Sequence, residues 1–186
     1  MSEGRPIEPD GDAITVEVAR DGRLKKTIRW EWNGNRVRIR APKRVPQRQL
    51  DRQVAEIIER VKRRRAKVRA QADADLEARA QRINGRYFDG DLTWHAIRWV
   101  SNMRKRLGSC TQGGPTDGDI RISSRIKGWP GWIVDYVVAH ELVHRAHPNH
   151  SAAFWACLAR YPKTERARGF IQGVAFQLGE DVEEWL

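Results

Sequence analysis

The sequence has few cysteines and no long apolar segment. Only Cys110 and Cys157 occur among the 186 residues. Two are too few for the disulfide framework of a small secreted domain, and they favour a reducing, cytoplasmic setting. The longest nearly apolar run, WIVDYVVA, is far shorter than the ~20 residues that a membrane-spanning helix needs. The start, MSEGRPIEPDGD, lacks both the apolar stretch and the basic residues of a signal peptide. We therefore expect no membrane insertion.

The sequence has fewer acidic than basic residues. The chain has 35 Lys and Arg residues against 24 Asp and Glu residues, a net charge of +11. Such a charge favours an acidic partner, whether nucleic acid, an anionic membrane surface or an acidic protein, and it is equally consistent with a plain solvated surface. The eight Trp residues indicate a packed core or an aromatic-lined cleft. The length suits one domain with some extension.

The first forty residues predict a tail followed by a small sheet. Residues 1–12 are polar and rich in Gly, Pro and acidic residues, which predicts a disordered tail. Apolar and polar residues alternate over residues 14–18, as in a strand. The segments TIRWEW and RVRIR flank Asn33 and Gly34, a strong signal for a two-residue hairpin turn. We therefore expect three antiparallel strands within residues 13–41.

A basic helix is predicted next. Apolar residues recur at helical spacing from Gln47 to about Arg69, and a second helical stretch covers roughly Asp73 to Asn84. The first helix carries a cluster without acidic residues, namely Arg60, Lys62, Arg63, Arg64, Arg65, Lys67 and Arg69. Such a cluster is typical of a solvated helix face, or of a face that contacts phosphates or docks a protein. Nucleic acid bound through the helix Arg60–Arg69 is thus one expected partner.

The remaining residues predict an α+β region with strands before helices. IRWVSN predicts a strand, and RLGSC, the loop TQGGPTDGD and IRIS predict a hairpin. A helix is expected from Pro130 or Gly131 to about Ala146, because Pro148 disfavours helical backbone in the residue before it. Ser151 is a candidate N-cap.

Two further helices are expected after Ser151. They cover residues 152–160 and about 165–177, and Pro162 separates them. The predicted organisation is a tail (1–12), a region of hairpin and basic helices (13–86), and a catalytic region (87–186), with the last two forming one compact unit.

The string AHELVHRAHPNH carries the strongest chemical signal. On a helix, His140 and His144 project from the same face, because residues four apart are neighbours there. Two imidazoles so placed grip one metal ion, and zinc suits them. Glu141 stands beside the first ligand, where a carboxylate can take a proton from water activated by the metal.

A third ligand is needed, and His150 is the best candidate. It follows the helix stop at Pro148, so a turn there would bring its side chain back over the metal. His147 is the weaker candidate. If the helix continued, His147 would lie about 10 Å along the axis from His140, and three ligands in a row cannot surround one ion.

Alternatives remain for this site and for Arg106. A structural zinc site usually has four protein ligands, often cysteines, so three histidines and an unused glutamate favour an open catalytic position. Arg106 precedes an expected turn at Gly108 and Ser109. It is either a cation that stabilises an oxyanion or a structural arginine paired with a carboxylate.

Several segments together resemble the YgjP-like metallopeptidases, a family related to SprT-like domains within the zincin group. The resemblance runs from roughly Ile14 to Gly173. The segments that carry it are RLGSC, IRIS, DYVVAHELVH, NHSAAFW and YPKTERARGF. It implies a zincin-like α+β metallopeptidase domain with an N-terminal strand and hairpin region and a basic connecting helix. It also implies zinc on His140, His144 and His150, with Glu141 as the acid/base.

The implied activity is zinc-dependent hydrolysis of peptide bonds in a polypeptide substrate. The alternatives are a DNA-associated SprT-like protease and a non-enzymatic module with structural zinc. The sequence departs from the family at Leu107, usually Trp, at Ser123 and Ser124, often Asn, and at Arg145, commonly apolar. We expect these departures to line the rim of the cleft and to affect substrate preference.

Overall fold

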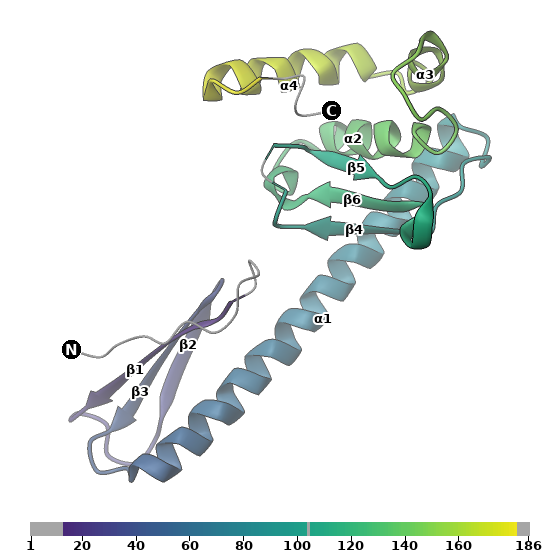
Figure 1. Ribbon diagram of the computed structural model, residues 1–186. Coiled ribbons are helices and arrows are strands. Elements are labelled where there is room, and N and C mark those ends of the chain that lie inside the picture. The colour runs from purple at the N-terminus through teal and green to yellow at the C-terminus, as the bar shows by residue number, and fades with distance from the viewer. Residues whose placement is uncertain (1–12, 104, 182–186) are drawn as a thin grey trace. The chain divides into compact units, whose positions relative to one another are not determined.

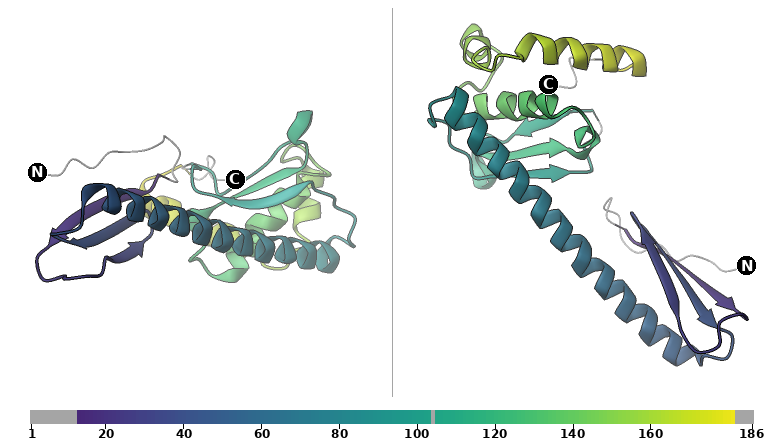
Figure 2. Two further views of the ribbon diagram at one scale, coloured as in Figure 1. Left: turned by 90° about the horizontal axis from the view of Figure 1, so that it is seen from below. Right: turned by 180° about the vertical axis from the view of Figure 1, so that it is seen from behind.

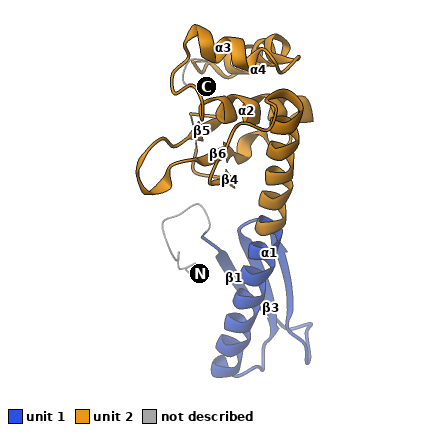
Figure 3. Cartoon of the chain, turned by 90° about the vertical axis from the view of Figure 1, so that its right-hand side faces the viewer, with its two compact units in different colours: residues 1–69 blue, residues 70–186 orange. Residues whose placement is uncertain are grey.

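The computed structural model describes residues 13–103 and 105–181 and shows an α+β chain, as predicted. The predicted tail, residues 1–12, lies outside the described residues. The chain forms two compact units, residues 1–69 and 70–186 (Figure 3). The division falls inside one long helix, so each unit is described by itself.

The first unit is a three-stranded sheet covered on one face by a helix (Figure 1). Its elements are β1 (Thr15–Asp21), β2 (Arg29–Asn33), β3 (Arg36–Pro42) and the first part of α1 (Gln47–Tyr87). Val37 and Ile39 of β3 pack with Ile57 and Val61 of α1 in a small core. The apolar alternation of the strands thus supplies the buried face of this sheet.

The predicted antiparallel arrangement is only partly correct. β2 and β3 form the expected antiparallel hairpin, but β1 pairs with β3 in parallel, and the order is β1-β3-β2. β3 is the central strand, and its inward residues are accordingly the most deeply buried of the three strands. The hairpin turn is Gly34–Asn35, one residue later than expected, because Asn33 already pairs with Arg36.

The two predicted helices before residue 87 are one continuous helix, α1. No Gly or Pro interrupts the sequence between the expected segments, and Gln71 and Ala72 are compatible with helix there. Residues 66–71 are exposed all round. Val68 is 59% exposed, so its helical spacing does not place it in the core.

The second unit layers a sheet, a buried helix and two outer helices (Figures 1 and 2). Its elements after α1 are β4 (Ala96–Val100), β5 (Gly108–Cys110), the short 3₁₀ turn η1 (Gly114–Thr116), β6 (Asp119–Ser123), the short 3₁₀ turn η2 (Ser124–Ile126), α2 (Gly131–Val143), α3 (Ala152–Leu158) and α4 (Thr164–Leu178). The sheet order is β4-β6-β5. β5 and β6 form the predicted hairpin, and β4 runs parallel to β6.

Helix α2 lies at the centre of this unit. Nearly all its residues from Ile133 to Val143 are buried, and they pack in one core with residues of β6, α3 and α4. Arg79 of α1 ties the helix start down, donating to Asp135 Oδ1 at 2.7 Å and to the Gly131 carbonyl at 2.9 Å. Among the described residues, none of the helices has the length and apolarity to cross a bilayer.

Helix boundaries in this unit fall close to the expected ones. α2 ends at Val143 rather than near Ala146, and His144 is its C-cap. Ser151 is the N-cap of α3, as predicted: its hydroxyl accepts from the Phe154 backbone N–H at 3.3 Å. This cap fixes the start of α3 directly after the last histidine of the motif.

Candidate metal centre

The helical spacing of His140 and His144 brings their imidazoles together at the end of α2. Their ring centroids are 4.9 Å apart, and the two Nε2 atoms are 3.2 Å apart. His140 is fully buried, whereas His144 is half-buried. The pair therefore presents two nitrogens at the boundary between the core and the surface.

His150 completes the cluster from outside the helix. After α2 the backbone turns, and the Nε2 atom of His150 lies 3.0 Å from that of His140. The ligand atoms of the three histidines all lie within 4.8 Å of one another. Within the described part of the chain, His147 is not a member of this group. The structure thus brings together the three histidines predicted from the sequence.

His147 instead contributes its backbone carbonyl. Nδ1 of His144 lies 3.1 Å from the His147 oxygen. A carbonyl only accepts hydrogen bonds, so Nδ1 carries the proton and Nε2 of His144 keeps its lone pair. Such an outer hydrogen bond fixes the tautomer and orientation of a metal-binding histidine.

The electrostatics of the site favour neutral imidazoles. Burial lowers the pKa of His140 well below its ordinary value, and the neighbouring His144 and His150 lower it further. Burial likewise lowers the pKa of His144 and of His150. The neutral form is the one that binds a metal ion.

The cluster fits a zinc ion. Two nitrogens bound to zinc at 2.0–2.1 Å with tetrahedral angles lie roughly 3.3 Å apart. The two short separations here, 3.2 and 3.0 Å, are close to that value. Nε2 of His144 has a lone pair and no proton, so it can bind a cation at the point where the three rings converge.

Two aromatic residues of α3 hold the imidazoles in place. The Phe154 ring centroid lies 4.7–4.9 Å from all three imidazole centroids. Trp155 stacks on His150 at 5.5 Å with an interplanar angle of 29°. Arg168 of α4 covers the Trp155 ring at 4.6 Å. Phe154 and Trp155 are three and four residues after the capping residue Ser151, and the sequence alone did not predict a role for them at the site.

Glu141 lies against the strand β5. Its side chain is buried, with 2% of its surface exposed. A Cβ built on Gly108 would lie 2.3 Å from its Oε1 atom, so only glycine leaves room for the carboxylate there. Burial raises the pKa of Glu141 to about 8, and the charge of Arg106 opposes this shift. Gly108, too, was missed as a site residue.

Arg106 is exposed at the start of this strand, with its charge near Glu141. The turn expected at Gly108 and Ser109 is in fact β5, where Gly108 pairs with Ile122. β5 is one strand of the β-hairpin, and the absence of a side chain at Gly108 allows Glu141 to approach this strand closely. Arg106 thus precedes the strand that contacts Glu141, and its role, oxyanion-stabilising or structural, stays a prediction.

The departures from the family pattern do not all line a cleft rim. Leu107 and Ser123 are buried, so they belong to the interior, contrary to the prediction. Arg145 anchors the loop between β5 and β6, donating to both carboxylate oxygens of Asp117 at 3.0 Å. Gln112 of the same loop donates to the His144 carbonyl at 2.7 Å. This loop is thus fastened beside the second histidine.

The segment that contains the three histidines and Glu141 is similar to known metallopeptidases. Residues 91–169 match the family model described as "YgjP-like, metallopeptidase domain", which confirms the resemblance over a narrower range than residues 14–173. No curated protein matches the sequence. One solved structure that matches is the metallopeptidase zymogen of Pyrococcus abyssi abylysin. It is 17% identical and covers 57% of this chain and 97% of that chain, with a TM-score of 0.46.

Proposed function

For a chain with a YgjP-like metallopeptidase domain, we propose zinc-dependent hydrolysis of peptide bonds in a polypeptide substrate. His140, His144 and His150 hold the zinc ion, and Glu141 is the general base. The observation that carries the proposal is the convergence of three imidazole nitrogens beside a buried carboxylate. Nitrogen donors of this kind suit zinc.

Each group has a defined task in this proposal. Zinc, when bound, supplies a Lewis acid and makes water a stronger acid. The charge of a bound zinc ion would favour the ionised form of Glu141 against the effect of burial, and this carboxylate accepts the proton of the attacking water and delivers it to the leaving amine. Gly108 lets the Glu141 carboxylate lie close to β5. The imidazoles are held in orientation by Phe154 and by the His147 carbonyl.

Arg106 is proposed to face the substrate. Its positive charge acts on Glu141, and it is exposed directly before β5. A fixed cation in that position stabilises the negative charge that develops on a carbonyl oxygen during attack. Arg106 is thereby proposed as an oxyanion-stabilising residue.

A purely structural zinc site is less well supported. Structural sites are usually closed by a fourth protein ligand. Within the described residues, the cluster has only three members, and His150 is exposed. An exposed ligand leaves the metal accessible to water and substrate.

The direct test is metal-dependent proteolysis. Protein stripped of metal is incubated with unfolded casein, with or without one equivalent of zinc, and fragments are followed by mass spectrometry. We expect fragments with zinc and none after addition of a chelator. Cleavage of equal rate in metal-free protein would contradict a metallopeptidase.

A further inference from the structure

The positive charge of the chain is concentrated in its first unit. Residues 13–69 contain 19 of the 35 Lys and Arg residues and 6 of the 24 acidic residues. Residues 70–186, which hold the metal centre, contain 15 basic and 14 acidic residues. The excess charge therefore belongs to the sheet and the first part of α1, and it is not needed to explain the candidate metal centre.

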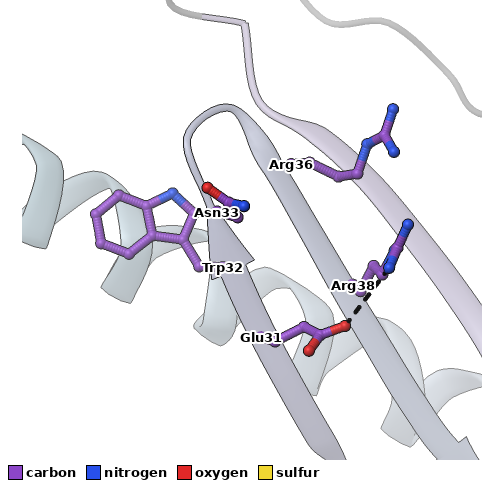
Figure 4. Close-up of a pocket in the computed structure, with 5 residues that line it drawn as sticks. All are labelled: Glu31, Trp32, Asn33, Arg36 and Arg38. Carbon is purple, nitrogen blue, oxygen red and sulfur yellow. Dashed lines mark ion pairs between the residues drawn. The ribbon is translucent and has the colours of Figure 1, made fainter.

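A hollow of about 460 Å³ lies at the β2–β3 hairpin of this unit (Figure 4). Its lining residues are Glu31, Trp32, Asn33, Arg36 and Arg38. Arg36 and Arg38 project from alternate positions of β3, opposite the buried Val37. The two arginines are therefore on the sheet face that α1 does not cover.

The hollow is built with fixed side chains. Both oxygens of Glu17 pair with these arginines, with Arg36 Nε at 3.3 Å and Arg38 Nε at 3.0 Å. Oε1 of Glu31 lies 3.8 Å from Nη1 of Arg38. Arg36 is thus held through Nε alone, whereas Arg38 is held at Nε by Glu17 and at Nη1 by Glu31.

Trp32 lies opposite Val37, so its ring packs on the sheet face that α1 covers, the other face from Arg36 and Arg38. Its indole N–H donates to the Gly34 carbonyl at 2.6 Å, and Arg64 of α1 lies over its ring at 5.7 Å. Figure 4 shows the ring beside β2 and the two arginines on β3. β2 is an edge strand, so a linear ligand that crosses it meets both features.

The basic cluster of α1 lies on the other side of the sheet, the side on which Trp32 packs. Arg60, Arg63, Arg64 and Lys67 follow at positions i, i+3, i+4 and i+7, so they share one side of the helix. Arg64 is the member that reaches Trp32. The remaining members of the predicted cluster point in other directions around the helix. This basic stripe therefore begins beside Trp32, at the edge strand β2.

We propose that this hollow binds single-stranded nucleic acid, with phosphates on Arg36 and Arg38 and a base stacked on Trp32. Arginine-rich surfaces suit phosphate because the guanidinium fork matches two phosphate oxygens, and 14 of the 19 basic residues in residues 13–69 are Arg. An aromatic platform beside basic side chains is the arrangement that binds unpaired bases. A peptide of Asp and Glu alone has no ring to stack on Trp32, and a duplex keeps its bases inside.

The proposal does not depend on the peptidase. The hollow involves only residues of the first unit, so binding is expected with or without zinc and in protein that carries Glu141→Gln. Failure of proteolysis would leave this inference standing, and failure of nucleic-acid binding would leave the proposed hydrolysis standing.

The test is fluorescence anisotropy with labelled 20-nucleotide dT and U strands over a range of salt concentrations. The double variant Arg36→Gln/Arg38→Gln is compared with Lys25→Gln/Lys26→Gln, which removes the same charge from exposed positions before β2. We expect the first pair to lower affinity at least ~10-fold and to flatten the salt slope by about 1.4, since each phosphate contact on a single strand contributes about 0.7. The control pair should change affinity less than ~3-fold.

Substitutions of Trp32 test stacking. Trp32→Leu should weaken binding at least ~5-fold, the lower end of the contribution of one stacked base, whereas Trp32→Phe should retain most of it. Circular dichroism confirms that each variant is folded. A preference for dT or U decides between DNA and RNA within the proposal.

Three results would overturn the inference. The first is no binding to either strand at 50 mM salt. The second is equal loss in the two charge variants. The third is equal competition by duplex DNA or poly-glutamate, which would show a general polyanion surface.

Discussion

Gly108 and Glu141 are in such close contact that a Cβ at Gly108 would lie 2.3 Å from Glu141 Oε1. Glu141 is buried, so the carboxylate has little room to move aside. We expect Gly108→Ala to displace the Glu141 carboxylate. Because a misplaced general base catalyses poorly, kcat/KM should fall at least ~10-fold. Zinc content, measured by mass spectrometry, should stay near that of the unmodified protein.

Gly173→Ala is the matched control for this substitution. Gly173 lies inside α4, and a Cβ there meets nothing within 4 Å. Alanine in a helix interior is favoured over glycine by up to ~1 kcal/mol. The control should therefore keep full activity and melt at the same or a higher temperature. If Gly108→Ala behaves as Gly173→Ala does, the close contact has no role in catalysis.

His150 and His147 differ in their expected effect on zinc affinity. His150 joins the cluster through Nε2, whereas His147 contributes a backbone carbonyl that survives mutation. Loss of an outer-shell partner costs ~10–100-fold in metal affinity, so loss of a ligand should exceed ~100-fold. His150→Ala should show this loss in a competition titration with a zinc chelator, and His147→Ala should change affinity less than ~10-fold. The reverse ranking would refute the assignment of the third ligand.

Zinc should stabilise the folded chain. Binding to the native state alone adds about 2.7 kcal/mol when free ligand is at 100 times its Kd. We expect about one zinc per chain and a lower melting temperature after chelation, restored by added zinc. His140→Ala, which removes the buried ligand at the centre of the cluster, should show no such shift. An unchanged melting temperature in the unmodified protein would argue against a site formed by folding.

The ion pair between Asp117 and Arg145 predicts a pH dependence. Hydrogen bonds from Arg145 hold the pKa of Asp117 at about 2, below the ~3.9 of an unperturbed Asp. Because the folded-state value is depressed, the stabilisation is present above the unfolded value and is lost as the pH falls towards 2. Asp117→Asn should lower the melting temperature of metal-free protein at pH 6, and the difference should shrink between pH 4 and pH 2. A constant difference would exclude this linkage.

The sequence predicted those parts of the site that depend on local spacing. His140 and His144 meet because four residues make about one helical turn, and His150 returns after the stop near Pro148 and the cap at Ser151. Gly108 was not predicted as a site residue. Its role arises from a contact between β5 and α2, more than thirty residues apart, and the local pattern predicted only a turn at Gly108 and Ser109.

The pairing of the strands and the continuity of α1 also could not be predicted from local sequence patterns. The alternation in residues 14–18 predicted a strand, but period-two alternation does not specify whether β1 pairs with β2 or with β3. The sequence predicted α1 as two helices, the first ending near Arg69 and the second beginning near Asp73, whereas it is one helix. The structure shows why: residues 66–71 are exposed all round, so no partner imposes a pattern there.

The measurement that tests the account most directly is the hydrolysis rate of Glu141→Gln protein with its zinc content matched to the unmodified protein. Glutamine keeps the size of the side chain but cannot accept the proton of the attacking water. We predict that zinc stays bound and that kcat for an unfolded protein substrate falls at least ~100-fold, the usual contribution of a general base. Hydrolysis at an undiminished rate with zinc in place would show that Glu141 is not the base.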